Sequence, residues 1–185
     1  MKETDEQIYS RFIRDRRNDD LKMLLERYRE NLTLFIFGIV HDLEDAEELM
    51  LDSFAVLVSD DPGFSGKSSF KTWLFAIGRN LALKHLRKKR FLPLDREGRD
   101  DGTQNDTPET DLIKNEQYKQ LYLAMEKLNP DYREILHLIY FEDMSMDEAA
   151  VIMKKSKKQI YNLSSRSKQA LKAELERTDF DIEFL

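Results

Sequence analysis

The sequence contains no cysteine, and this single absence excludes several classes of protein. Disulfide-stapled domains, enzymes with a catalytic thiol and cysteine-based zinc sites all require the sulfur atom. Small secreted domains commonly depend on disulfides for their stability. We therefore expect a protein of a reducing compartment, the cytoplasm.

Glycine and proline are also scarce, with 6 and 4 in 185 residues. A β-sandwich or barrel needs many tight turns, which these two residues commonly supply. Charged residues make up 36% of the chain, a share that suits small helical modules with much solvated surface. The composition predicts an all-α fold.

Long hydrophobic runs are missing too. The most apolar stretch, residues 32–40, is interrupted by Thr33 and Gly38. It is far shorter than the roughly 20 residues that cross a bilayer. Residues 1–17 are charged and lack the apolar core of a signal peptide. We expect no insertion into a membrane.

The charges are strongly segregated along the chain. The net charge of −6 would by itself argue against a nucleic-acid-binding protein. However, residues 62–94 hold eight Lys or Arg and no acid, and residues 149–173 hold seven and no acid. Residues 42–61 hold eight acids and no base, and residues 95–111 hold seven acids against two arginines. Such segregation produces local fields that the average hides, and it predicts two basic surfaces.

Four helices are expected in the first half of the chain. Thr4 and Gln7 have the spacing of a capping box at a helix start. Residues 18–20 are expected to cap a second helix that has one apolar face up to Leu32 and then becomes apolar on nearly every side to position 40, as in the centre of a bundle. A third helix follows position 42, and a fourth runs from about 70 to 89. The inward residues of the first and fourth are expected to be Ile8, Phe12, Ile13, Phe70, Trp73, Leu74, Ile77 and Leu81, whereas Phe75, Arg79 and Asn80 point away from that face or lie at its rim.

A polar segment divides the chain. Residues 95–111 contain almost nothing apolar and are rich in Gly, Asp and Asn, so they cannot bury a core and are expected to form a flexible linker. A second helical domain follows, with Tyr118, Leu121, Tyr122, Met125 and Leu128 on one face of its first helix. The domains are therefore expected at residues 1–92 and 112–177, with a linker at 93–111 and a tail at 178–185.

The end of the second domain has the pattern of a helix-turn-helix. Asn129 and Pro130 are an N-cap and a first helical residue, and Ser145 and Ser156 each open a capping box. A short helix, a three-residue turn and a longer basic helix result, with Lys155 in the turn position where Gly is usual for positive φ. In this motif the second helix enters the major groove. Its expected exposed residues are Lys157, Lys158, Gln159, Tyr161, Asn162, Ser165, Arg166 and Gln169; the alternative is a solvated amphipathic helix in a helical hairpin.

Residues 70–90 alternate aromatic and basic side chains. Such tracks suit unpaired bases, which stack on aromatic rings once they leave the duplex. The alternative is that the aromatic residues are core and the lysines are merely solvated. For Phe70 and Trp73 core burial is the favoured interpretation.

Nothing in the sequence indicates catalysis. The three histidines at 41, 85 and 137 are far apart, and Gly66-Lys67-Ser68 lacks the earlier glycine of a phosphate-binding loop. The acids between positions 42 and 52 fit no calcium loop, and a solvated or partner-facing surface is favoured for them. We expect a non-enzymatic protein with no metal, no cofactor and no small-molecule substrate.

Over residues 19–90 and 112–172 the chain resembles the extracytoplasmic-function group of bacterial RNA polymerase sigma factors. The resemblance rests first on Asp45-Ala46-Glu47-Glu48-Leu49. It continues with the pattern F-x-x-W-L-x-x-I-x-R-N-x-A over residues 70–82. The second domain adds residues 128–135 and the helix-turn-helix.

The resemblance implies a transcription initiation factor with three sets of functional residues. The third helix would bind core RNA polymerase, the β and β′ subunits, through Asp45, Glu48, Leu49, Leu51, Asp52 and Phe54. The loop and fourth helix would melt and read the −10 element, with a flipped base received near residues 63–69, through Phe64, Lys67, Ser68, Lys71, Trp73, Phe75, Arg79, Asn80, Lys84 and Arg87. The second domain would read the −35 element through Lys157, Lys158, Gln159, Tyr161, Asn162, Ser165 and Arg166.

The resemblance also implies an anti-sigma factor as a partner, and it places the protein on the nucleoid in the cytoplasm. The sequence departs from the family pattern at Leu51, where glutamine is common, at residues 56–58, where a tryptophan is common, and at residues 159–163 of the recognition helix. Two other interpretations stay open. One is a stand-alone helix-turn-helix regulator with an N-terminal sensing or dimerisation domain. The other is a nucleic-acid-processing enzyme that uses the acids of residues 42–61.

Overall fold

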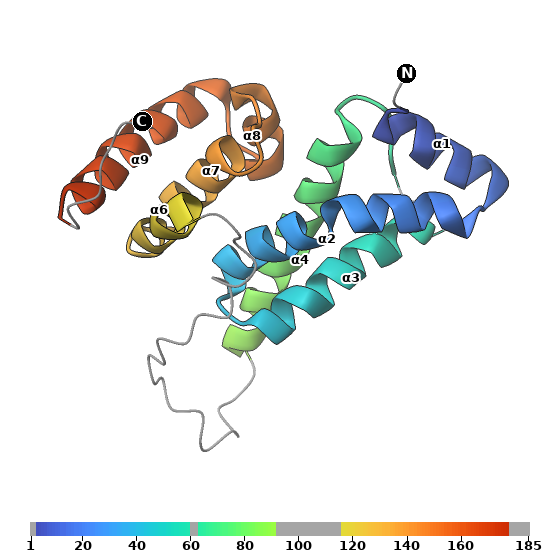
Figure 1. The fold of residues 1–185 in the computed structure, drawn as a ribbon, viewed down its shortest axis with the longest axis horizontal. Helices are drawn as coiled ribbons and strands as arrows, with labels where there is room; N and C mark the ends of the chain where they lie inside the picture. Colours follow the sequence, from blue (N-terminus) through green and yellow to red (C-terminus); the bar gives the residue numbers. More distant parts are fainter. Residues whose placement is uncertain (1–2, 60–62, 92–115, 178–185) are drawn as a thin grey trace, which may run out of the picture.

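The computed structural model describes residues 3–59, 63–91 and 116–177, and every regular element in these ranges is an α-helix (Figure 1). The helices are α1 (Asp5–Asp15), α2 (Asn18–Val40), α3 (Leu43–Val58), α4 (Phe70–Phe91), α6 (Glu116–Glu126), α7 (Pro130–Tyr140), α8 (Met146–Met153) and α9 (Lys157–Glu176). The all-α prediction is confirmed. The predicted linker and the tail at 178–185 lie outside the described residues.

Side-chain caps set the start of most helices, as predicted. The hydroxyl of Thr4 accepts a hydrogen bond from the N–H of Gln7, whose side chain accepts one from the N–H of Thr4. The same reciprocal box forms between Ser145 and Glu148 and between Ser156 and Gln159. These bonds satisfy backbone N–H groups that have no partner inside a helix, so purely local chemistry fixes the helix boundaries.

The start of α2 differs from the prediction. The helix begins at Asn18 with Arg17 as its N-cap, and no side chain caps it. Asp20 is only 2% exposed and accepts hydrogen bonds from Arg11 of α1, at 2.6 Å between Nη2 and Oδ1. This pairing lowers the pKa of Asp20, against the effect of desolvation. The carboxylate therefore holds two helices together rather than capping one.

Helix α2 is the centre of the first domain, as the nearly all-round apolar character of its last part, residues 32–40, predicts. It packs against α1, α3, α4 and α7, and Leu32, Phe35 and Ile36 are completely or almost completely buried. Helix α4 approaches α2 closely at Gly78. A Cβ atom there would lie only 2.9 Å from Cδ1 of Leu32.

Helix α1 covers an aromatic cluster at the start of α4. The ring of Tyr9 lies 5.6 Å from Phe64, 5.1 Å from Phe70 and 5.5 Å from Trp73, centroid to centroid. Its hydroxyl donates a hydrogen bond of 3.1 Å to the carbonyl of Leu57. Ile13, which was expected to face inward, is 37% exposed. Tyr9 takes the buried position instead.

Helices α6 to α9 form the second domain, in which α7 and α9 make the main contact. The turn between α8 and α9 contains a left-handed residue, as a helix-turn-helix requires. That residue is Lys154, with φ of 52°, and not Lys155 as expected. Lys155 instead pairs with Asp131 at 3.0 Å.

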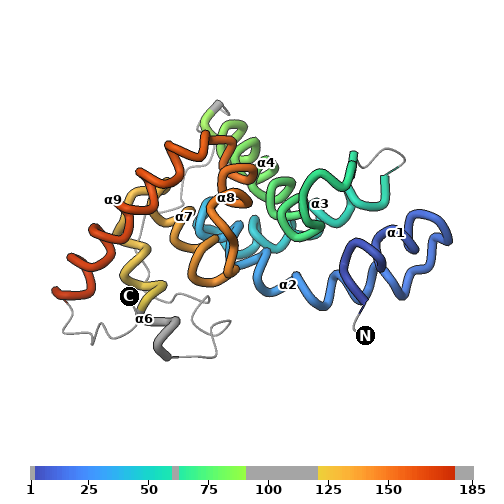
Figure 2. The backbone as a smooth tube through the Cα atoms, turned by 90° about the horizontal axis from the view of Figure 1, so that it is seen from above, coloured from blue at the N-terminus to red at the C-terminus, as the bar shows by residue number. Residues whose placement is uncertain are grey.

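The two domains are in contact. Helix α8 packs on α4, and α7 packs on α2, so the two middle helices of the second domain rest on two helices of the first (Figure 2). Helix α9 packs on α7 and α8, and its C-terminal part lies at the left of this view, away from the first domain.

Candidate nucleic-acid and polymerase interfaces

The first half of α9 presents a polar and basic surface. Ile160, Ser164, Ser167 and Leu171 face the domain core, at spacings of three and four. All seven residues predicted to read the −35 element are exposed: Lys157, Lys158, Gln159, Tyr161, Asn162, Ser165 and Arg166. An exposed row at the start of the second helix is the geometry by which a helix-turn-helix meets base edges.

Two of these residues have partners within the domain. The amide oxygen of Gln159 accepts the N–H of Ser156 at 2.8 Å, which leaves its NH2 group for other contacts. Lys157 donates to Asp147 at 2.7 Å, and this bond raises the pKa of the ammonium group. Both groups are therefore held near the start of α9.

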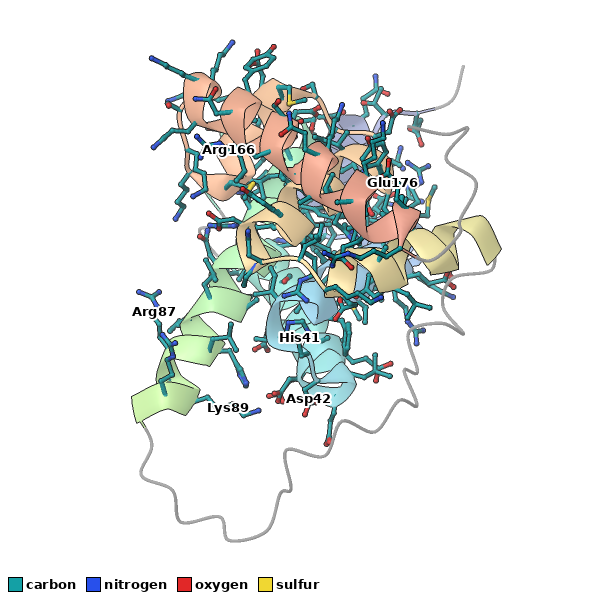
Figure 3. All side chains as sticks on the ribbon, turned by 90° about the vertical axis from the view of Figure 1, so that its left-hand side faces the viewer. His41, Asp42, Arg87, Lys89, Arg166 and Glu176 are labelled. Carbon is teal, nitrogen blue, oxygen red and sulfur yellow. The ribbon has the colours of Figure 1, made fainter. Side chains whose placement is uncertain are left out.

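A shallow pocket of about 250 Å3 adjoins this row. Gln159, Asn162 and Arg166 line it together with Tyr132 of α7 and Lys155 of the turn. Sequence reasoning missed Tyr132 and Lys155 as neighbours of this surface. Only the fold brings α7 beside the start of α9. Figure 3 places Arg166 on the same helix.

The residues predicted to read the −10 element fall into separate environments. Phe64 and Trp73 belong to the aromatic cluster, with centroids 4.9 Å apart, and both are partly exposed. Phe70, beside them, is completely buried, as expected of a core residue. The two partly exposed rings stand at the loop before α4, where an unpaired base could stack.

Two other residues of the set are buried, against expectation. Phe75 is 0% exposed and packs on Phe35, with centroids 5.3 Å apart. Arg79 is 8% exposed and pairs with Glu134 of α7. The prediction that Phe75 and Arg79 point away from the inner face or lie at its rim is wrong, because Phe75 packs on α2 and Arg79 is covered by α7 of the other domain. Lys71 lies on this covered side too, where its ammonium group pairs with Glu142.

The remaining members of the set lie toward solvent. Lys67, Asn80, Lys84 and Arg87 are exposed, and Ser68 is partly exposed. A groove of about 1020 Å3 between α4, the end of α2 and the start of α7 is lined in part by Asn80, Lys84 and Arg87. Figure 3 shows Arg87 and Lys89 near the C-terminal end of α4. This end of α4 carries four consecutive exposed basic residues, at positions 87–90.

Helix α3 has an acidic outer face. Of the six residues predicted to bind polymerase, Glu48, Leu51 and Asp52 are exposed, and Leu51 is 56% exposed. Leu49 and Phe54 face the core instead. An exposed leucine between acids is a plausible contact for a protein partner, since isolated apolar anchors with a polar rim are common in interfaces.

The sixth residue of that set, Asp45, has partners within the domain. Its Oδ2 atom lies 3.0 Å from Nε2 of His85 and 3.2 Å from Nζ of Lys89. These contacts tie the start of α3 to the end of α4. The acidic face and the basic end of α4 are thus held in one rigid unit.

Among the residues that the structure describes, no three His, Asp or Glu side chains are grouped as metal ligands would be. In the same part of the chain, no helix is long and apolar enough to span a membrane. The exposed features are surfaces rather than enclosed sites. They suit macromolecular partners.

Comparison with known proteins identifies the family of the two helical domains. Residues 24–91 match the family described as Sigma-70 region 2, and residues 118–171 match Sigma-70, region 4. Together the two matches span about two thirds of the chain. They begin and end within the two helical domains.

Individual relatives agree with the family matches. The ECF RNA polymerase sigma factor SigX of Bacillus subtilis is 24% identical over 164 residues, which are 85% of this chain and 84% of SigX. The RNA polymerase sigma-H factor of Pseudomonas aeruginosa is 28% identical over 162 residues, which are 82% and 83% of the two chains.

Solved structures share the fold. CnrH, in complex with the cytosolic domain of CnrY, has a TM-score of 0.66 at 20% identity and covers 95% of this chain and 99% of its own. The sigma factor RpoE of Bartonella quintana, in complex with the anti-sigma factor NepR, has a TM-score of 0.62 at 22% identity, with coverages of 85% and 97%. The chain belongs to the sigma-70 family of RNA polymerase sigma factors, in its extracytoplasmic-function group, and is a promoter-specific transcription initiation factor.

Proposed function

We propose that α9 reads the −35 element of the promoter in duplex DNA. The observation that carries this assignment is the exposure of all seven polar residues in the first turns of α9, next to a helix-turn-helix turn. Asn162 and Gln159 are suited to adenine, and Arg166 to guanine or phosphate. No acid lies between positions 149 and 173 to repel the DNA backbone.

The loop at residues 63–69 and α4 open and read the −10 element. The partly exposed rings of Phe64 and Trp73 offer stacking surfaces, and stacking contributes roughly 1–3 kcal/mol per base. Asn80, Lys84 and Arg87 line the groove farther along α4 and supply polar and cationic contacts. Lys67 and Ser68 provide further donors in the loop.

The outer face of α3 binds core RNA polymerase, in its β and β′ subunits. Glu48, Leu51 and Asp52 make the direct contacts, because they are exposed. Asp45 acts indirectly through its pairs with His85 and Lys89, and Leu49 and Phe54 act by supporting the helix from the core. The exposed acids fit a basic surface on the polymerase.

The two functional domains span residues 1–92 and 112–177. The acidic segment 93–111 connects them and lies near the RNA exit path of polymerase, where other sigma factors have a longer connecting domain. Residues 178–185 form a tail. These extents are supported by the family matches at 24–91 and 118–171, which fall inside them.

Three further assignments follow from membership of the family. The chain has no catalytic activity of its own, since polymerase supplies the chemistry of transcription. It acts in the cytoplasm, on the nucleoid. An anti-sigma factor controls it; the structures of RpoE with NepR and of CnrH with CnrY support a partner of this kind.

Run-off transcription with purified core polymerase on a promoter library tests the proposal. We expect defined transcripts only when the chain is added. Operator binding without any effect on transcription would indicate a stand-alone regulator. Metal-dependent cleavage of the DNA, lost in Asp45→Ala and Glu48→Ala variants, would indicate a nuclease.

A further inference from the structure

Helix α1 contacts both ends of the loop that connects α3 to α4. At the end of α3, the hydroxyl of Tyr9 donates a buried hydrogen bond of 3.1 Å to the backbone carbonyl of Leu57. At the start of α4, the carboxylate of Glu6 accepts the backbone N–H of Phe70 at 2.8 Å. Glu6 and Tyr9 are three residues apart, so they are neighbours on the surface of α1. One short stretch of α1 thus fixes the last turn of α3 and the first turn of α4.

The ring of Tyr9 also contacts the loop itself. It lies 5.6 Å from the ring of Phe64 at an interplanar angle of 80°, an edge-to-face arrangement that aromatic pairs favour. It lies 5.5 Å from Trp73, whose ring is 4.9 Å from that of Phe64. Tyr9 is only 2% exposed, whereas Phe64 and Trp73 are partly exposed. Tyr9 therefore supports from the interior the two rings on which an unpaired base could stack.

Helix α1 is in turn attached to α2 by charged side chains. Arg11 pairs with Asp20 at 2.6 Å, and the Asp20 carboxylate is almost completely buried. Asp5 pairs with Arg27 and also accepts a hydrogen bond from the hydroxyl of Tyr28. Because α2 is the centre of the first domain, these pairs fix α1 independently of the loop.

The loop contains two glycines that make its conformation depend on contacts from outside. Gly63 and Gly66 have φ of 75° and 70°, a conformation that glycine adopts at little cost. Glycine also loses more conformational freedom than any other residue when a chain becomes ordered. Phe64 is the only aromatic residue at positions 63–69 and contacts Tyr9 directly. The contacts from α1 therefore offset part of the entropy that the ordered loop loses.

We propose that Tyr9 and Glu6 are positioning residues for the −10 element: they hold the loop at residues 63–69 in the conformation that receives an unpaired base. This inference rests on the proposed function of the loop and of α4. The two residues act through the rings of Phe64 and Trp73. They do not contact DNA themselves, because Tyr9 is buried and the carboxylate of Glu6 would repel phosphate.

The fluorescence of Trp73 tests the positioning in the free protein, because Trp73 is the only tryptophan of the chain. Tyr9→Ala removes the ring that supports it, so the emission should shift to longer wavelength and be quenched more strongly by acrylamide. Glu6→Ala should act in the same direction. Glu6→Gln keeps an oxygen that accepts the N–H of Phe70 and should resemble the wild type. Ile13→Ala is the matched control, since Ile13 also lies on α1 but is 37% exposed.

Two further variants separate positioning from a general loss of stability. Tyr9→Ala leaves a cavity in the core, and Tyr9→Leu replaces it if the alanine variant does not fold. Asn129→Ala removes the side-chain cap of α7 in the second domain, so it should cost about as much stability as Glu6→Ala does. Its Trp73 emission should nevertheless equal that of the wild type. Urea unfolding measures the stability of every variant.

The consequence for promoter reading is measured with the holoenzyme, assembled from the full-length chain and core polymerase. Promoters found in the run-off transcription experiment are prepared with each of the four bases at the −10 position most sensitive to substitution. Glu6→Ala should reduce discrimination among them, and the permanganate reactivity of −10 thymines, roughly fivefold, since a helix cap changes a local equilibrium by about that factor. Glu6→Gln should retain most of both. The affinity of the two Glu6 variants for polymerase should be unchanged.

Four results would overturn the inference. The first is wild-type fluorescence of Trp73 in a folded Tyr9→Ala or Tyr9→Leu variant. The second is an equal loss of promoter opening in Asn129→Ala, and the third is an equal loss in Glu6→Gln and Glu6→Ala. The fourth is a loss of opening that matches a loss of polymerase affinity. If no promoter is transcribed, the proposed function fails, and the fluorescence still decides whether α1 holds the aromatic cluster.

Discussion

Glu6 of α1 caps α4, because its Oε1 atom accepts a hydrogen bond of 2.8 Å from the backbone N–H of Phe70, 64 residues away. The bond lowers the pKa of Glu6, against a smaller opposing effect of burial. An acid at this place also interacts favourably with the positive end of the helix. The loop before α4 is thus fixed by a residue that lies outside the family match at 24–91.

Replacing Glu6 should destabilise the protein in a pH-dependent manner. Loss of a helix cap costs about 1 kcal/mol, and we expect Glu6→Ala to lower the free energy of unfolding by that amount at pH 7. Because the pKa of Glu6 is lowered on folding, its contribution is present above the usual value of 4.5 and is lost as pH falls below it. Urea unfolding of wild type and Glu6→Gln should therefore converge in acid. A difference that stays constant down to pH 3 would contradict this account.

Gly78→Ala should destabilise the protein although it improves helix propensity. Alanine gains up to about 1 kcal/mol over glycine in a helix. Its Cβ atom would lie 2.9 Å from Leu32 and 3.2 Å from Ile36, and overpacking of this kind costs about 1–3 kcal/mol. Gly38→Ala is the matched control, since its Cβ atom would meet only Tyr122, at 3.7 Å, and it should be neutral or stabilising. Thermal unfolding that ranks the two variants in the reverse order would refute the argument.

Asn80→Ala should impair promoter opening more than polymerase binding. Asn80 is exposed and lines the groove, to which α3 contributes no residue, so its loss should leave the polymerase-binding face of α3 intact. Permanganate reactivity of unpaired thymines measures opening, and gel filtration with core polymerase measures binding. An equal loss of both would show that the residue is structural.

The two kinds of residue on α9 should have distinguishable effects. Asn162→Ala should change the preferred −35 sequence, because a bidentate base contact is worth about 1–3 kcal/mol of discrimination. Arg166→Ala should weaken binding to all promoters and, if it holds a phosphate, reduce the salt dependence by about one unit. Selection from a promoter library at two salt concentrations measures both. Unchanged selection in every α9 variant would remove the assignment of this face.

On α3, replacing an exposed residue should affect polymerase binding, whereas replacing a buried residue should affect the stability of the protein. Leu51→Ala should weaken polymerase binding by about 1–2 kcal/mol, as for an apolar anchor in an interface, and leave stability unchanged. Phe54→Ala should cost about 3–5 kcal/mol of stability, because Phe54 faces the core. Fluorescence titration with core polymerase and urea unfolding measure the two effects. Normal polymerase affinity of Leu51→Ala would exclude the outer face of α3 as the main contact.

The features that sequence reasoning predicted correctly depend on neighbouring residues. The capping boxes of Thr4, Ser145 and Ser156 each form between residues three apart, so their spacing is visible in the sequence. The same holds for the inner faces of the helices, which recur at three and four residues. The helix-turn-helix follows from these two signals alone.

The features that sequence reasoning missed depend on contacts between segments that are distant in the sequence. The sequence position of Asp20 predicts a helix cap, but its carboxylate accepts hydrogen bonds from Arg11 of another helix instead. Phe75 and Arg79 lie off the predicted inner face of α4, and nothing local indicates that Phe75 packs on Phe35 of α2 or that Arg79 pairs with Glu134 of α7. The position with positive φ in the turn was predicted at Lys155 and lies one residue earlier, at Lys154. Because the two neighbouring residues are both lysines, their side chains do not indicate which of them adopts positive φ.

The cover that α1 provides has a consequence during protein synthesis. Tyr9 and Glu6 leave the ribosome first, yet their partners at Leu57, Phe70 and Trp73 follow up to 64 residues later. At a translation rate of about 5–20 residues per second, the side of α1 that packs on α4 stays exposed for roughly 3–13 s before α4 is synthesised. In a nascent chain, α1 therefore has only its contact with α2 available, and the side that packs on α4 stays uncovered until the start of α4 has emerged. Slow codons between positions 58 and 73 would lengthen this exposure.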